Sequence, residues 1–135
     1  MEEEYAKSRN MKILARIRAY EDAEVSPVDF STAPSTGILN LLKKNNLKVN
    51  DINAFEINEA FASVVLANMQ ILGIDVNKVN LHGGAVALGH PVGVSGARII
   101  LSLMSVLQKT KGSLGVASIC NGGGGSTSIL IENLI

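Results

Sequence analysis

The fold is decided by a glycine-rich loop and the apolar segment behind it, residues 82–109, which read HGGAVALGHPVGVSGARIILSLMSVLQK. The second part of this stretch, from about Ser95 to Lys109, predicts a helix. The five glycines before or within its first turn allow the backbone to approach a ligand closely. We therefore expect a loop of this kind where a strand gives way to a helix, which is where open α/β sheets build their sites.

Short strands and helices alternate on both sides of this unit. The period-two alternation from Lys12 to Tyr20 predicts a strand. In chain order we expect the following elements: helix 2–9, strand 12–20, helix 34–45, strand 54–57, helix 59–72, strand 79–81, helix 95–109, and strands 114–119 and 128–131. After the first helix the order is β-α-β-α-β-α-β-β. It predicts an α/β fold with a mixed sheet and helices on both faces.

Composition narrows the class of protein. With 135 residues, 47% of them hydrophobic, the chain corresponds to one domain, residues 1–135. Twelve basic and twelve acidic side chains cancel, so no basic stripe for nucleic acid is expected. The apolar runs are shorter than the roughly 20 residues of a membrane span, and no membrane partner is expected. The acidic start MEEEYAKSRN differs from a secretory or transit leader.

The first candidate site residue is Asn58, at the point where a predicted strand turns into a helix. Its side-chain oxygen could cap that helix, and from spacing alone the cap is the favoured interpretation. The alternative is that Asn58 and Glu59 face a site at the strand's C-terminal end.

The second candidate is His90, which lies between Gly89 and Pro91 in the glycine-rich loop. A histidine held by rigid backbone is suited to proton transfer. The alternative is a structural or phosphate-binding loop, although the segment from Gly93 to Gly96 is too loose to match a nucleotide fingerprint.

The third candidate is Cys120, the only cysteine, at a predicted strand end before Asn121 and four glycines. The glycine N–H groups could converge on a developing negative charge. A thiol becomes a useful base only beside a cationic or hydrogen-bonding group, which His90 could supply. The alternative is an inert buried cysteine before a flexible turn.

Taken in order, NEAFA at 58–62, GGAVALGHPVGVSGARI at 83–99 and CNGGGGS at 120–126 resemble the C-terminal signature of the thiolases. The resemblance covers essentially the whole chain and implies one half of the thiolase fold. The GGGG and GGAVALGHP forms, with ARIRAYEDA at 15–23, look most like acetoacetyl-CoA thiolases, which are acetyl-CoA C-acetyltransferases of fatty acid metabolism. Such enzymes require no organic cofactor and act on coenzyme A thioesters.

The resemblance also implies roles for residues. His90 would activate a nucleophilic cysteine, and Cys120 would move the α-proton of the second acetyl-CoA. Asn58 would hold a water beside His90 that stabilises the enolate oxygen, and the Gly122 N–H would serve a second oxyanion site. The same resemblance places Ala60 and Phe61 in the acyl pocket and gives the backbone carbonyl of Val86 to a potassium ion.

By the same resemblance, the nucleophilic cysteine, the coenzyme-A-binding loop domain and most of a dimer interface lie in an N-terminal half that this sequence lacks. We therefore expect a truncated or split chain with little activity by itself, whose partner is an N-terminal thiolase half within a homodimer or homotetramer. Cytoplasmic and mitochondrial members share these motifs. The alternative functions are a binding or interaction module and a fragment without function of its own.

Overall fold

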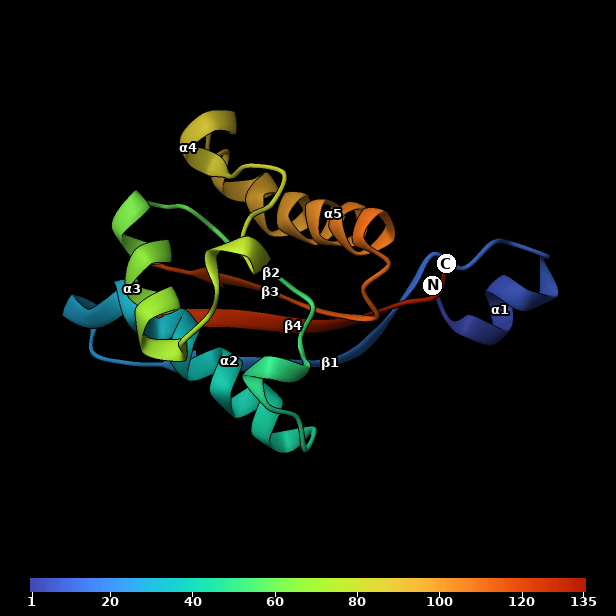
Figure 1. Ribbon diagram of the computed structural model, residues 1–135, viewed down its shortest axis with the longest axis horizontal. Coiled ribbons are helices and arrows are strands. Elements are labelled where there is room, and N and C mark those ends of the chain that lie inside the picture. The colour runs from blue at the N-terminus through green and yellow to red at the C-terminus, as the bar shows by residue number, and fades with distance from the viewer.

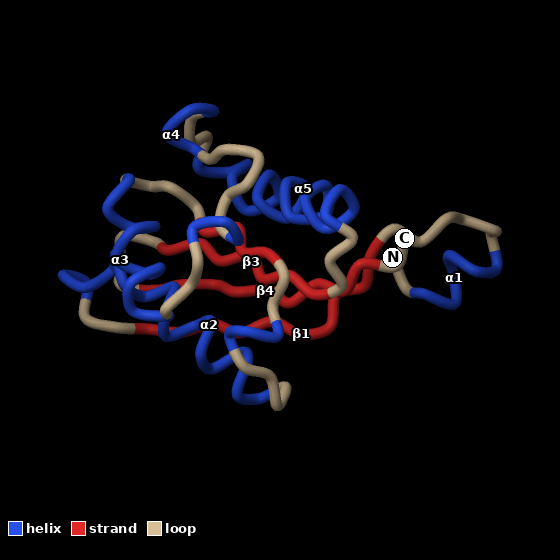
Figure 2. Tube along the Cα trace, viewed as in Figure 1, coloured by secondary structure: helices blue, strands red, loops and turns tan.

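The computed structural model describes all 135 residues as an α/β domain (Figure 1). Its helices and strands, in chain order, are α1 (Glu3–Ser8), β1 (Ala15–Glu24), α2 (Ala33–Lys44), β2 (Ala54–Ile57), α3 (Ala62–Leu72), α4 (Ala85–Leu88), α5 (Val92–Thr110), β3 (Leu114–Cys120) and β4 (Gly125–Asn133). Short 3-10 turns occupy Pro27–Thr32, Val49–Asp51 and Val76–Lys78. Both termini lie at the end of the sheet that carries α1 (Figure 2).

The four strands form one mixed sheet in the order β1-β4-β3-β2. Strands β2 and β3 are parallel, whereas β4 is antiparallel to both of its neighbours. The hairpin between β3 and β4 matches the sequence prediction, as does the crossover between β2 and β3 through helices. The expected class, an α/β fold with a mixed sheet, is confirmed.

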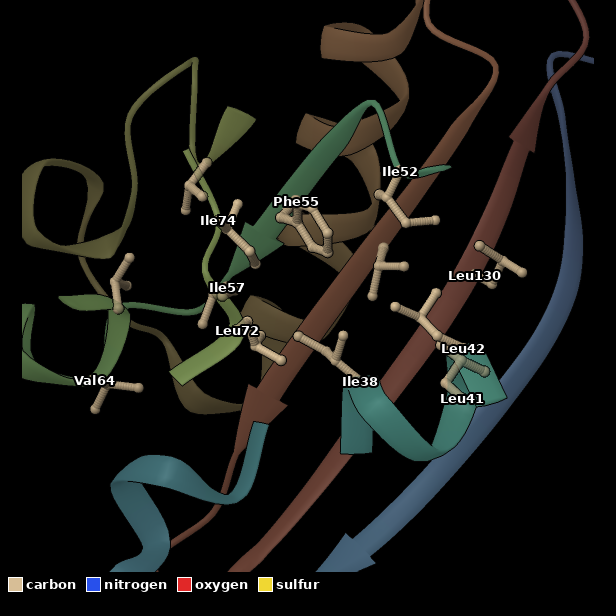
Figure 3. Packing of buried hydrophobic residues seen from close by; sticks show 13 residues of the cluster. Ile38, Leu41, Leu42, Ile52, Phe55, Ile57, Val64, Leu72, Ile74 and Leu130 are labelled. Atoms are coloured by element: carbon tan, nitrogen blue, oxygen red, sulfur yellow. The ribbon is translucent and has the colours of Figure 1, made fainter. Parts of the chain in front are cut away.

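Helices cover both faces of the sheet, with α5 on one side and α2 and α3 on the other (Figure 1). Phe55 and Ile57 of β2 point into the larger core with Ile38 and Leu42 of α2 (Figure 3). Ala54 points to the opposite face, where it joins a smaller core built on Leu103 and other residues of α5. This alternation follows from the period of two along a strand, and it places Glu56 on the α5 face.

One expected strand, 79–81, is reduced to a single parallel bridge between Val79 and Phe55. Pairing cannot continue because a 3-10 turn ends at Lys78 and Asn80 takes a left-handed conformation with φ of 49°. The Asn80 side chain replaces the missing ladder: its Oδ1 accepts from the Ile57 N–H and its Nδ2 donates to the Ile57 carbonyl, both at 2.9 Å.

Two helix starts also differ from the sequence prediction. Helix α3 begins at Ala62 rather than at Glu59, because residues 58–61 stay non-helical and Phe61 is extended, with φ of −144° and ψ of 153°. Helix α5 begins three residues early, directly after Pro91. The result is that His90 lies immediately before the first turn of α5.

Helix α5 is long and apolar enough to cross a membrane by length and composition alone. In this fold, however, Ile99, Leu103 and Leu107 pack against the sheet, so α5 serves as a core helix of the domain.

Candidate active site

The candidate site lies where β2 and β3 end side by side. Ile57 pairs with Ser118, and the Asn58 N–H donates to the Ser118 carbonyl at 2.9 Å. Asn58 therefore leaves β2 near the point where β3 reaches Cys120. This placement agrees with the expectation that the candidate residues gather at the carboxyl ends of parallel strands.

The Asn58 side chain is completely buried, at 0% exposure, and it does not cap a helix. Its Nδ2 lies 3.5 Å from His90 Nε2, and its Oδ1 accepts from Arg98 Nη2 at 3.3 Å. The interpretation as a helix cap is wrong because α3 starts at Ala62 and its first turn has no side-chain cap. Asn58 instead links β2 to the loop and helix that carry His90 and Arg98.

His90 is positioned by backbone on both sides. Gly89 takes φ of 89°, a conformation that favours glycine, and Pro91 follows. His90 Nδ1 lies 2.6 Å from Ser95 Oγ, which in turn donates to the Pro91 carbonyl at 3.2 Å. One ring nitrogen thus faces the first turn of α5, and the other faces Asn58.

Cys120 lies half-buried at the end of β3, where it packs against the larger core together with Ala60. Burial raises the pKa of its thiol above the ordinary value, and a hydrogen bond from its own backbone N–H opposes that rise. The structure records no hydrogen bond between the thiol and His90 or Asn58. It brings Asn58 and His90 into contact, and it leaves Cys120 as a protonated thiol at neutral pH.

The glycine turn after Cys120 presents one free N–H group rather than four. Asn121 accepts hydrogen bonds from the N–H groups of Gly123, Gly124 and Gly125, at 3.0, 3.2 and 3.3 Å. The N–H of the exposed Gly122 has no acceptor in the protein. A convergence of all four N–H groups is therefore wrong, and only Gly122 remains free to bind an external oxygen.

The two residues expected in an acyl pocket have different surroundings. Ala60 is half-buried against the larger core. Phe61 is 61% exposed and makes an edge-to-face contact with Phe30, with 6.5 Å between the ring centroids. Both residues lie between Asn58 and α3, and Phe61 presents a large apolar surface beside the site.

Sequence reasoning missed the role of Glu59. Its carboxylate accepts from the Val86 N–H at 2.8 Å and from Asn80 Nδ2 at 3.0 Å. Gly84 passes so close to Glu59 that an added Cβ would overlap the carboxylate. Glu59 thus fastens the start of the glycine-rich loop to the end of β2.

Sequence reasoning also missed a buried charge pair beneath Asn58. Glu56 is 1% exposed, and its Oε2 lies 3.6 Å from Arg98 Nη1. That separation is too long for a hydrogen bond, and neither Glu56 oxygen nor Arg98 Nη1 has a hydrogen-bond partner. Burial raises the pKa of the Glu56 carboxyl to about 7 despite the opposing charge of Arg98. A charged residue inside the strand AFEI was the available signal.

A separate cavity of about 620 Å³ lies near the other end of the sheet, lined mostly by apolar residues that include Leu14, Ile100 and Met104. None of the candidate site residues lines it. The cavity is therefore distinct from the group formed by Asn58, His90 and Cys120.

Comparison with known proteins identifies the family. The thiolase C-terminal domain model matches residues 11–133. The chain is 53% identical to a mitochondrial acetyl-CoA acetyltransferase of Mus musculus over 99% of this chain and 31% of that protein. It superposes with a TM-score of 0.96 on the acetyl-CoA acetyltransferase of Bacillus anthracis, at 42% identity over 99% of this chain and 34% of that one.

A further structural match is the Acat5 thiolase of Ascaris suum in complex with coenzyme A, with a TM-score of 0.93 and 44% identity over 98% of this chain and 34% of that one. The chain spans about a third of the length of the curated relatives it matches. The sequence motifs, the mixed sheet and these matches agree: the chain belongs to the thiolase family and forms its C-terminal domain.

Proposed function

We propose that this domain supplies the C-terminal part of a thiolase active site of the acetyl-CoA C-acetyltransferase type. The reaction would condense two acetyl-CoA molecules into acetoacetyl-CoA and free coenzyme A, or run in reverse. The observation that carries the proposal is the contact of 3.5 Å between buried Asn58 and His90, whose other ring nitrogen contacts Ser95.

His90 is the proposed general base. Contacts on both ring nitrogens hold the imidazole in one orientation, which general-base catalysis requires. His90 would take the proton of a nucleophilic cysteine as that thiol attacks the acyl carbon of a coenzyme A thioester, and it would give a proton to the coenzyme A thiolate that leaves. Asn58, with its Nδ2 beside the same ring nitrogen, would orient a water that donates to the enolate oxygen.

Cys120 is the proposed acid and base for the carbon chain. In condensation its thiolate would take an α-proton from acetyl-CoA, and in cleavage its thiol would return a proton to the departing enolate. Because burial raises the pKa of Cys120, the isolated domain favours the protonated, acid form. The free N–H of Gly122 would bind the thioester oxygen beside it, and Ala60 and Phe61 would line the acyl pocket.

The rest of the reaction requires protein outside this chain. We expect an N-terminal thiolase half to contribute the nucleophilic cysteine and the coenzyme-A-binding loop domain, within a homodimer or homotetramer. A mitochondrial compartment would agree with the names of relatives such as the mouse enzyme, and a cytoplasmic one remains the alternative.

A potassium ion would find one ligand in this domain. The Val86 carbonyl accepts no hydrogen bond from the protein, and Val86 is exposed. Hard cations take several oxygen ligands, and no group of three or more His, Cys, Asp or Glu residues gathers here. The remaining oxygens would come from outside this domain, so Val86 fits as one ligand of a shared site.

The test is thiolytic cleavage of acetoacetyl-CoA by this chain mixed with a separately made N-terminal thiolase half. His90→Ala and Cys120→Ser should each remove nearly all of the activity. His82→Ala is the matched control, because His82 is exposed in the same loop and makes no side-chain hydrogen bond. Activity that survives both site variants would overturn the catalytic assignment.

A mixture that associates but cleaves nothing would favour the alternative function, an interaction module. Size-exclusion chromatography of the mixture separates that result from a failure of the two halves to associate.

A further inference from the structure

A buried charge pair lies directly behind the site. Glu56 on β2 and Arg98 on α5 face each other at 3.6 Å, and Arg98 Nη2 reaches Asn58 Oδ1 at 3.3 Å. Burying two charges costs free energy that an apolar pair of similar size would not. A pair that leaves both carboxylate oxygens without hydrogen bonds is poorly explained as a device for stability alone.

The guanidinium fixes which way the Asn58 amide points. Arginine carries only hydrogen-bond donors, so the Asn58 atom that faces Arg98 must be the carbonyl oxygen. The amide nitrogen then faces His90, where it can only donate. His90 Nε2, at 3.5 Å, can accept from this donor only when it presents its lone pair rather than a proton.

The same direction continues to the far side of the imidazole. With Nε2 as acceptor, the proton of neutral His90 sits on Nδ1 and is donated to Ser95 Oγ, 2.6 Å away. Ser95 Oγ in turn donates a hydrogen bond to the Pro91 carbonyl at 3.2 Å, which can only accept. Every hydrogen bond from Arg98 to Pro91 thus runs in one direction, from an obligatory donor to an obligatory acceptor.

We propose that Arg98, held in place by Glu56, is a positioning residue that acts through Asn58 to keep His90 in the tautomer with its proton on Nδ1. This tautomer leaves the Nε2 lone pair on the side of Asn58, where the base is needed. The positioning is a property of this chain alone, whereas its consequence for catalysis rests on the proposed function.

Without Arg98 the Asn58 carbonyl oxygen loses the donor that holds the amide in this orientation. A flip of the amide would place Oδ1 against His90 Nε2, and an oxygen acceptor at that position would favour a proton on Nε2. Glu56 contributes by supplying the opposite charge that keeps the guanidinium behind β2. Lysine at position 98 would retain a donor and a positive charge, so it should preserve the orientation in large part.

The experiment reads the His90 tautomer by ¹⁵N NMR in the 135-residue chain at alkaline pH. In the unaltered chain the Nδ1–H form should dominate. The variant Arg98→Met/Glu56→Met removes donor and carboxylate together, so no charge is left buried without a partner. In it the ratio of the two tautomers should fall about fivefold, the effect of one hydrogen bond of ordinary net strength.

Arg98→Lys should retain most of the original ratio. Arg18→Met is the matched control, because Arg18 also pairs with a carboxylate, that of Glu132, but lies near the opposite end of the sheet. In the mixture with the N-terminal half, the double variant should lower kcat with little change in KM, whereas Arg98→Lys should keep most of the original kcat.

Two results would overturn the inference: a proton on Nε2 in the unaltered chain, which needs no variant to fold, or an unchanged ratio in the folded double variant. Because the tautomer is read without substrate or partner, a failure of the mixture to cleave acetoacetyl-CoA would count against the proposed function alone.

Discussion

Glu59 and Val86 are joined by a hydrogen bond of 2.8 Å between a side-chain carboxylate and a backbone N–H, 27 positions apart in the sequence. The second carboxylate oxygen binds Asn80 Nδ2 at 3.0 Å. The glycine-rich loop is thus held to β2 only a few residues before His90. This attachment controls where the histidine lies when it meets Asn58.

Replacing Glu59 with alanine should therefore loosen the loop. Hydrogen bonds to a charged group contribute about 1.5–3 kcal/mol each, and Glu59 accepts two of them. Glu59→Ala should therefore lower the free energy of unfolding by about 3 kcal/mol, measured by urea denaturation. The Val86 amide should also exchange with solvent faster. Glu24→Ala is the control, since Glu24 is exposed and has no hydrogen bond or ion pair from its side chain. Equal effects of the two substitutions would contradict the role of Glu59.

Gly84→Ala tests the same contact from the other side. Its Cβ would overlap the Glu59 carboxylate, so one of the two must move, at a cost of about 1–3 kcal/mol of unfolding free energy. Gly93→Ala, at a helical position with open space around it, should instead be neutral or stabilise the chain by up to about 1 kcal/mol. A tolerated Gly84→Ala would show that the loop is free to shift.

The buried carboxyl of Glu56 predicts a dependence of stability on pH. Burial raises its pKa from 4.5 to about 7, with Arg98 opposing and Glu59 adding to the rise. The folded chain therefore binds this proton more tightly than the unfolded chain. The free energy of unfolding should fall as pH rises from about 4.5 to about 7 and then level off, by an amount on the order of 3 kcal/mol at 1.36 kcal/mol per unit.

Glu56→Gln removes this contribution. Between pH 5 and pH 8 the unaltered chain should lose unfolding free energy relative to Glu56→Gln. Thermal or urea denaturation at both pH values measures it. A difference that stays constant across this window would mean that Glu56 does not titrate there.

Cys120 should be a slow nucleophile in the isolated domain. Burial raises the pKa of its thiol, and only the thiolate reacts with alkylating reagents. At pH 8 the reaction with iodoacetamide should be slower in the folded chain than in the same chain in urea, and it should speed up as pH rises further. Mass spectrometry follows the single adduct. Faster reaction in the folded chain would point to a hydrogen bond or cation that the structure does not contain.

Local sequence signals sufficed for most of the fold. The hairpin around Asn121 and the helix after Pro91 follow from turn residues and apolar spacing, and both were predicted. The strand at 79–81 was wrong because its place beside β2 is taken by the side chain of Asn80, a contact 23 positions away in the sequence from Ile57. No local pattern distinguishes such a side chain from an ordinary turn asparagine.

The site was predicted less completely. Family motifs pointed to Asn58, His90 and Cys120, but not to the groups that hold them. Arg98 reaches Asn58 across 40 positions, and its role depends on β2 and α5 packing face to face. An arginine in an apolar helix and a glutamate in an apolar strand were visible in the sequence; that they face each other was not.

The two borders of the sheet differ because Asn80 covers one of them. The Asn80 side chain binds the N–H and the carbonyl of Ile57, and the Asn80 backbone N–H donates to the Phe55 carbonyl at 2.9 Å. The β2 border is therefore closed to further strands. Strand β1 forms the opposite border and pairs on one side only. Any added strand must join at β1, so the sheet can grow in a single direction.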